Sequence, residues 1–92
     1  MSQPRKYDSY LTDEFFTYYR RLSGPVRERA RETYERWKKN HEASGLDFKT
    51  LATDKSVCQV RIGDHYRATG LLVGNAVHWF WIGTKNDFKK KF

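Results

Sequence analysis

Two arginines flank a short turn in the second half of the chain, and their type and spacing suit them to bind an anion. Arg61 and Arg67 stand on either side of residues 63–65, each within an alternating apolar pattern typical of a half-buried β-strand. A three-residue turn would place the two guanidinium groups side by side on one sheet face. Because such cations repel each other and each donates two parallel hydrogen bonds, the pair predicts a phosphate site. The alternative is that both arginines keep the face soluble or pair with Asp64 and Asp87.

Other basic, polar and aromatic side chains are expected near this pair. The same register places Gln59 and His78 on the face of the two arginines, and Lys49 and Lys85 lie in the adjoining segments. Phe88 adds a ring that could stack on a base. Cations beside aromatic rings are the composition of a site for single-stranded nucleic acid.

Metal and nucleophilic chemistry have weaker support. His41-Glu42 begins like a zinc-protease motif, but position 45 is glycine where the second histidine would stand. The single cysteine, Cys58, and the three scattered histidines lack metal-ligand spacing. Cys58 alternates with apolar residues, so we expect a buried, inert thiol. The sequence therefore predicts a site without a metal or a cofactor.

Two helices are expected in the first half of the chain, after a loosely ordered segment over residues 1–8. Thr12 has the side chain of a helix N-cap, and the apolar stripe after it ends at residues 23–25. A second amphipathic helix runs to about Lys39. The short connection predicts an antiparallel hairpin whose apolar stripes face one partner.

That partner is a β-sheet in the second half of the chain. Three strands are expected at about 56–62, 66–73 and 76–82, preceded by an extended segment at 46–49. A two-residue turn at Gly74-Asn75 predicts the following pairs on the core face: Leu72 with Val77, Gly70 with Trp79, and Ala68 with Trp81. The predicted fold is α+β, with an N-terminal antiparallel helix hairpin on a small antiparallel sheet of three to four strands.

The C-terminal segment carries lysines and two phenylalanines. Phe88 and Phe92 are spaced i,i+4, so one helical turn would place both rings on one side and anchor the segment on the sheet. The alternative is a frayed tail, since termini are disordered unless they are held down.

Length and composition restrict the class of protein. The 92 residues form one domain over residues 1–92, and the 16% aromatic content argues against disorder. A net charge of +7 predicts an anionic partner: nucleic acid, an acidic protein segment or a membrane surface. The single cysteine excludes an internal disulfide and suggests a reducing compartment. With no signal peptide and no run of 18 apolar residues, we expect a soluble cytoplasmic protein.

Taken in order, these segments resemble the RelE/ParE superfamily of toxins from bacterial type II toxin–antitoxin systems, particularly its short plasmid-stabilisation branch. The resemblance covers about residues 10–90. It rests on the order and spacing of Phe15, Leu22, Pro25, Ala30, Tyr34 and Trp37, then Leu46-Asp47-Phe48-Lys49, Val60-Arg61-Ile62-Gly63, Tyr66-Arg67-Ala68-Thr69-Gly70 and His78-Trp79-Phe80-Trp81-Ile82-Gly83.

The resemblance implies an mRNA endonuclease that acts on ribosome-bound message and is held inactive by a cognate antitoxin. In such enzymes no metal is used, and the 2′-hydroxyl of one nucleotide attacks the next phosphate. By position, Arg67 would grip the scissile phosphate and Arg61 would support it from the neighbouring strand. Lys85 would stabilise charge or protonate the leaving oxygen, and Lys49 would hold the RNA backbone.

Two residues depart from the pattern of that branch. Lys85 stands where the branch often has a histidine, and Phe88 where it often has a tyrosine. A phenyl ring transfers no proton, and lysine is ordinarily a poor base at neutral pH. Two alternatives therefore stay open: a ParE-like toxin that inhibits DNA gyrase by binding it, and a RelE-like binding module with weakened catalysis. The paired arginines favour the nuclease.

Overall fold

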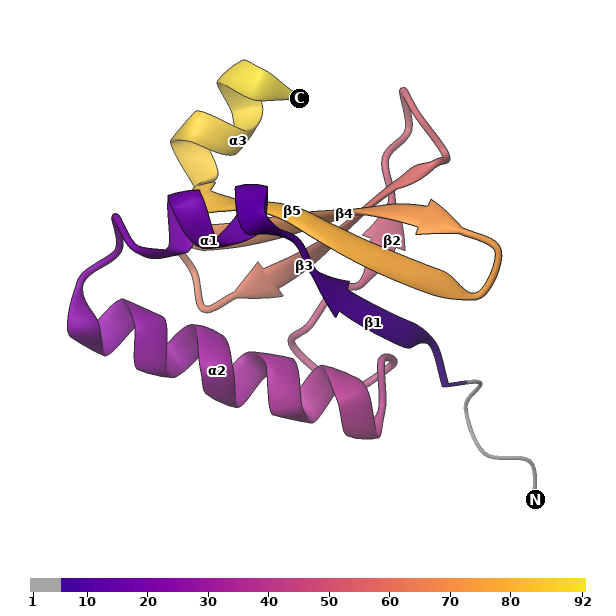
Figure 1. The fold of residues 1–92 in the computed structure, drawn as a ribbon, viewed down its shortest axis with the longest axis horizontal. Helices are drawn as coiled ribbons and strands as arrows, with labels where there is room; N and C mark the ends of the chain where they lie inside the picture. Colours follow the sequence, from indigo (N-terminus) through magenta and orange to yellow (C-terminus); the bar gives the residue numbers. More distant parts are fainter. Residues whose placement is uncertain (1–5) are drawn as a thin grey trace.

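The computed structural model describes residues 6–92 as an α+β fold, with helices on both faces of a five-stranded sheet (Figure 1). Residues 1–5 lie outside the described part of the chain. The elements in chain order are β1 (Asp8–Leu11), α1 (Asp13–Tyr19), α2 (Gly24–Lys39), β2 (Lys49–Thr50), β3 (Val57–Ile62), β4 (Tyr66–Val73), β5 (Ala76–Thr84) and α3 (Lys85–Lys91).

The sheet is mixed and has the strand order β1-β5-β4-β3-β2. Strands β2 to β5 pair in antiparallel fashion, whereas β1 runs parallel to β5 at the edge. The prediction of an all-antiparallel sheet of three to four strands was therefore wrong. Strand β1 was not predicted because its four residues are mostly polar and do not alternate with apolar ones. A loosely ordered segment was predicted over residues 1–8, but the Tyr7 ring stacks on that of Trp37 and Asp8 is the first residue of β1. The prediction was therefore wrong for these two residues.

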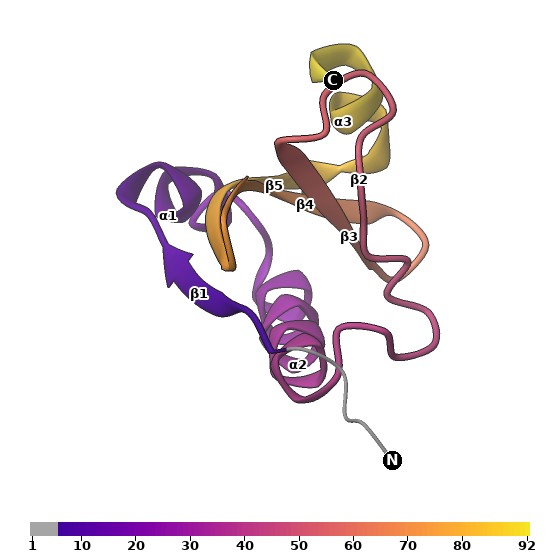
Figure 2. The same cartoon turned by 90° about the vertical axis from the view of Figure 1, so that its right-hand side faces the viewer.

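Side-chain caps start the first two helices. Thr12 Oγ1 accepts a hydrogen bond from the backbone N–H of Phe15 and donates one to the Trp79 carbonyl, which ties α1 to β5. Ser23 caps α2, which ends at Lys39 as expected. The two helices run in opposite directions, and α2 and α3 lie on opposite sides of the sheet (Figures 1 and 2).

The main core lies between the sheet and the helices α1 and α2. Its buried members come from all these elements: Phe15, Ala30, Trp37, Leu46, Cys58, Val60, Ile62, Ala68, Val77, Trp79 and Ile82. Burial raises the pKa of the Cys58 thiol to about 11, so the sulfur stays protonated at neutral pH. The expected inert thiol is confirmed.

The predicted turns and most of the predicted register are confirmed. Residues 63–65 form the three-residue turn that places Ile62 opposite Tyr66. Across the next turn, Gly70 lies opposite Trp79. The apolar sets of β3 and β4 therefore share the core face, as burial requires.

A β-bulge changes the register in the second half of β5. Phe80 is an extra residue between Trp79, which pairs with Gly70, and Trp81, which pairs with Thr69. The predicted pair of Ala68 with Trp81 was therefore wrong. After the bulge, Ile82 faces the core opposite Ala68, and Trp81 faces the other side of the sheet.

Gly70 is required by close packing in the core rather than by its backbone angles. A Cβ atom at Gly70 would lie 2.5 Å from Cγ1 of Val77 and 3.1 Å from Cε3 of Trp79, and both neighbours are buried. We expect Gly70→Ala to lower the free energy of unfolding by about 1–3 kcal/mol, measured by urea denaturation. Gly24→Ala is the control, because no atom of residues 6–92 lies within 4 Å of the added Cβ there. Equal urea midpoints for the two variants would contradict this packing.

Candidate functional site

The candidate site lies on the sheet face that carries α3. Two cross-strand rows run over this face at neighbouring levels. The arginine row consists of Arg61, Arg67 and Gly83, and the adjacent row consists of Lys49, Gln59, Thr69 and Trp81. The structure therefore brings both predicted arginines, Lys49 and Gln59 together on one face.

Arg61 is held by the turn that follows its own strand. Its Nη2 donates to Oδ1 of Asp64 at 2.7 Å, and its Nε donates to the Gly63 carbonyl at 3.1 Å. The Asp64 carboxylate is 80% exposed, so solvent weakens this ion pair. The alternative pairing with Asp64 thus exists for Arg61, and within residues 6–92 neither arginine pairs with Asp87.

Arg67 carries the less balanced charge of the two. Its Nη1 donates to the Tyr66 carbonyl at 2.8 Å, and among the described residues it has no carboxylate partner within 4.0 Å. Partial burial lowers the pKa of Arg67, and the neighbouring charge of Arg61 lowers that pKa further. Asp47 and Asp64 offset part of this shift. Since arginine nevertheless stays protonated, a bound anion would relieve the repulsion between the two guanidinium groups.

Lys49 and Gln59 lie next to this pair in the adjacent row. Lys49 is the first residue of β2 and pairs across the sheet with Gln59 of β3. Its Nζ lies 3.2 Å from Oδ2 of Asp47, but both side chains are more than half exposed. Solvent screens such a pair, so Lys49 is available to a phosphate on this face.

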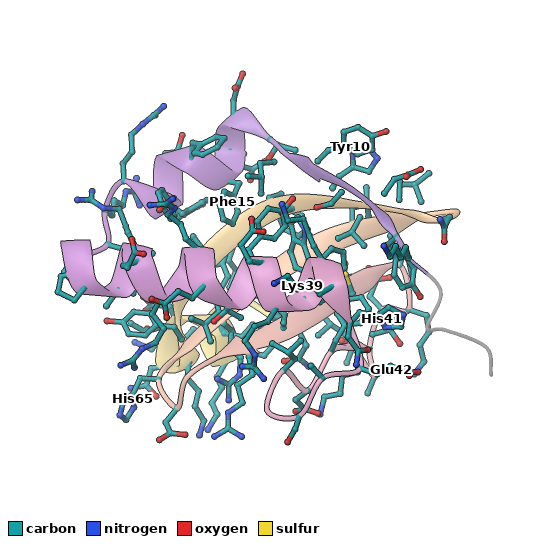
Figure 3. The ribbon with its side chains drawn as sticks, turned by 90° about the horizontal axis from the view of Figure 1, so that it is seen from below. Tyr10, Phe15, Lys39, His41, Glu42 and His65 are labelled. Atoms are coloured by element: carbon teal, nitrogen blue, oxygen red, sulfur yellow. The ribbon has the colours of Figure 1, made fainter. Side chains whose placement is uncertain are left out.

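Lys85 is the first residue of α3 and comes two positions after Gly83 of the arginine row. Thr84 caps this helix, and the backbone N–H of Lys85 donates to the His65 carbonyl at 2.7 Å. The contact ties Lys85 to the same turn that holds Arg61. Figure 3 shows His65 at the opposite end of the molecule from His41. Lys85 itself is exposed, and in residues 6–92 it forms no ion pair.

The C-terminal segment is a helix that packs on this face. The Phe88 and Phe92 ring centroids lie 5.3 Å apart, and they lie 6.3 and 5.6 Å from that of Trp81. The predicted helical turn with both rings on one side is confirmed. Trp81 is 3% exposed and Thr69 is fully buried, so part of the face that the sequence left open is covered.

His78 is the predicted site residue that the structure leaves apart. It pairs with Leu71, four residues after Arg67 in β4, which is about 13 Å at roughly 3.3 Å per residue. Its ring stacks on Tyr10 at 4.9 Å and 18°. His78 therefore shares the face but belongs to its far end.

Three residues near the arginines were not predicted from the sequence to belong to this site. The charge of Asp47 raises the pKa of Arg67, and no local sequence pattern predicts that these two residues lie close together. Trp81 lies on this face because of the bulge. The residue in the sequence that fits this position is Gly83, since a Cβ atom there would lie 2.7 Å from the Trp81 indole. His65 adds an imidazole at the turn between β3 and β4.

The assembled groups suit phosphate binding more than metal chemistry. The cationic side chains of Lys49, Arg61 and Arg67, from three neighbouring strands, share one face, where they could hold a backbone and stabilise negative charge. Over residues 6–92, no three side chains of His, Cys, Asp or Glu gather as a metal site requires. None of the helices in that range combines the length and apolar character needed to cross a membrane.

Comparison with known proteins identifies the fold. No protein-family model and no curated protein matches the sequence. The RelB–RelE antitoxin–toxin complex from Methanococcus jannaschii matches with a TM-score of 0.71 and 15% identity, over 90% of this chain and 98% of that one. A mutant of E. coli toxin RelE in the free state matches with a TM-score of 0.67 and 12% identity, over 92% and 90%. The archaeal RelE–RelB complex from Pyrococcus horikoshii OT3 matches with a TM-score of 0.65 and 13% identity, over 88% of this chain and 97% of that one. The chain thus has the RelE-like fold that the resemblance implied.

Proposed function

We propose that this chain, which has the fold of RelE toxins, is the toxin of a type II toxin–antitoxin pair and cleaves ribosome-bound mRNA in the cytoplasm. The observation that carries the proposal is the cross-strand pair of Arg61 and Arg67, which are half-buried side by side and have one carboxylate, that of Asp64, within ion-pair distance among residues 6–92. A pair of this kind binds a phosphate diester through its two non-bridging oxygens. Lys49 and Gln59 extend the contact along the RNA backbone.

The reaction proceeds without a metal. The 2′-oxygen of one nucleotide attacks the next phosphorus and loses its proton, while the bond to the 5′-oxygen breaks and that oxygen gains a proton. The products are a 2′,3′-cyclic phosphate and a 5′-hydroxyl. Arg67 holds the phosphate, and Arg61 from the neighbouring strand adds charge that stabilises the transition state.

Proton transfer is the less well-equipped part of this site. Phe88, in α3, has no proton to give. Lys85 comes two residues after Gly83, the last member of the arginine row. In this proposal Lys85 protonates the leaving oxygen. His65, tied to Lys85 through the backbone, offers a second group at the same turn.

We infer that the partner in the cell is a cognate antitoxin. The matching structures from M. jannaschii and P. horikoshii are antitoxin–toxin complexes. The +7 charge of this chain favours an acidic segment that folds as it binds. Such a segment would cover Arg61 and Arg67 or hold α3 away from them. An antitoxin that contacted only α1 and α2 and left this face open would contradict direct occlusion.

Induced expression with and without the adjacent antitoxin gene tests the proposal. We expect growth arrest by the toxin alone, with message cut at discrete sites inside translating ribosomes, mapped by primer extension. Growth arrest with intact message and relaxed DNA supercoiling would instead support the ParE-like alternative, gyrase binding. The lack of a phenol at Phe88 is the observation that favours that alternative.

Arg61→Ala is expected to weaken RNA binding without unfolding the protein. The substitution removes one phosphate contact, so the slope of log K against log salt should fall by about 0.7. Fluorescence anisotropy with a single-stranded RNA that carries 2′-deoxy sugars measures this slope without cleavage. Arg31→Ala is the control, because it removes the same charge from α2 on the opposite side of the sheet. Equal slopes for the two variants would exclude Arg61 from the interface.

A further inference from the structure

A second cleft, of about 560 Å³, lies between the end of α1 and α3. Strand β1 ends opposite Trp79, so in the described chain the outer edge of β5 from Phe80 to Thr84 has no neighbouring strand. The end of α1 and the helix α3 flank this part of β5 and form the walls of the cleft. The cleft adjoins the arginine row, because Gly83 belongs to both.

The walls of this cleft are positively charged. Arg21, Lys90 and Lys91 line it and are exposed. Within residues 6–92, none of the three has a carboxylate within 4.0 Å. Of the described residues that form the lining, Asp87 is the one with an acidic side chain. The cleft therefore has cations without matching anions.

Aromatic rings supply the rest of the lining. Tyr18, Tyr66 and Trp81 contribute to it. The Arg21 guanidinium carbon lies 5.2 Å from the centroid of the Tyr18 ring, and Lys91 Nζ lies 5.7 Å from the same centroid. The Tyr18 and Trp81 rings lie 6.1 Å apart. Arg21 and Lys91 are thus held against the Tyr18 ring by cation–π contacts rather than by ion pairs.

We propose that this cleft binds one nucleotide of single-stranded RNA beside the nucleotide pair that is cleaved. The base stacks against the half-buried rings of Tyr18 and Tyr66, and its phosphate lies among the three cations. A volume of about 560 Å³ lies within the usual range for sites that hold a small ligand. An acidic peptide would use the cations but would leave the rings without a stacking partner, so the lining favours RNA. The assignment rests on the proposed nuclease function and adds a subsite to it.

The position of the cleft fits an RNA strand that continues past the arginines. Tyr66 lines the cleft, and its carbonyl accepts the hydrogen bond from Arg67. Lys85 begins the helix whose later residues, Lys90 and Lys91, line the cleft. A strand whose scissile phosphate is held by Arg67 therefore meets the cleft with an adjoining nucleotide.

Binding of two probes tests this subsite. Both are fluorescein-labelled RNAs with 2′-O-methyl sugars at every position, which blocks cleavage: a dinucleotide that spans the scissile phosphate, and a pentanucleotide that extends beyond it. The double variant Arg21→Ala, Lys91→Ala should bind the pentanucleotide about tenfold more weakly, measured by fluorescence anisotropy, and the dinucleotide almost as wild type does. The control Arg20→Ala, Lys89→Ala removes two neighbouring charges from outside the lining.

The outcomes separate the cleft from the nuclease. If wild type cuts no message but the cleft variant still loses affinity for the pentanucleotide, the subsite stands and the proposed function fails. If wild type cuts message and the cleft variant binds both probes like the control variant, the subsite is wrong and the function stands. An octaglutamate peptide that binds the cleft more tightly than the pentanucleotide would also overturn the assignment to RNA.

Discussion

Arg67→Ala is expected to abolish toxicity while the fold stays intact. Arg67 is the arginine of the cross-strand pair without a carboxylate partner in residues 6–92, so its charge is the more available to a scissile phosphate. Loss of one group that stabilises transition-state charge typically lowers the rate by about 10²–10³-fold. Growth after induction and primer extension on ribosome-bound message measure the effect.

The stability of this variant should stay within about 0.5 kcal/mol of wild type, as for most surface substitutions. Folding lowers the pKa of Arg67, which means that its positive charge slightly disfavours the folded state. Removal of that charge is therefore not expected to lower the free energy of unfolding. Arg67→Lys keeps a charge without the planar fork and should retain part of the activity. Arg31→Ala, on α2, is the charge-matched control. A variant that unfolds, or one that remains fully toxic, would place the chemistry elsewhere.

Sequence patterns predicted the parts of this fold that depend on local periodicity. The cap at Thr12, the end of α2 at Lys39 and the turn at residues 63–65 all follow from residue types within a few positions. The pairing of Arg61 with Arg67 followed from that turn, because a one-residue shift would have placed apolar side chains in water. Local signals therefore sufficed for the centre of the site.

Long-range features could not be predicted in the same way. Strand β1 is stabilised by pairing with β5, about 70 residues later, and its own sequence has no strand pattern. The bulge at Phe80 inserts one residue without a glycine or proline to mark it, and it moves Trp81 to the face of the arginines. The cover that α3 places over Thr69 and Trp81 depends on that bulge. The distance between His78 and the arginine row likewise depends on strand length rather than on which face a residue occupies.

Lys85→Ala is expected to lower cleavage by at least about tenfold, which corresponds to roughly 1.4 kcal/mol of transition-state stabilisation. Lys85 is the first residue of α3, and its backbone N–H donates to the His65 carbonyl at the turn that holds Arg61. In the proposed mechanism its ammonium group stabilises charge on the leaving oxygen. Single-turnover cleavage of ribosome-bound message measures the rate. Phe88→Tyr should raise that rate, because a phenol on the same helix adds a proton-transfer group that this chain lacks.

Lys89→Ala is the matched control for Lys85, since it removes the same charge from the same helix and leaves the start of α3 unchanged. Its cleavage rate should equal that of wild type. A His65→Ala variant measured beside Lys85→Ala shows which group carries the proton: a steeper loss at His65, with a changed pH profile, would assign proton transfer to the imidazole. Wild-type rates for both Lys85→Ala and Phe88→Tyr would exclude α3 from the chemistry and leave it the structural role of covering Trp81.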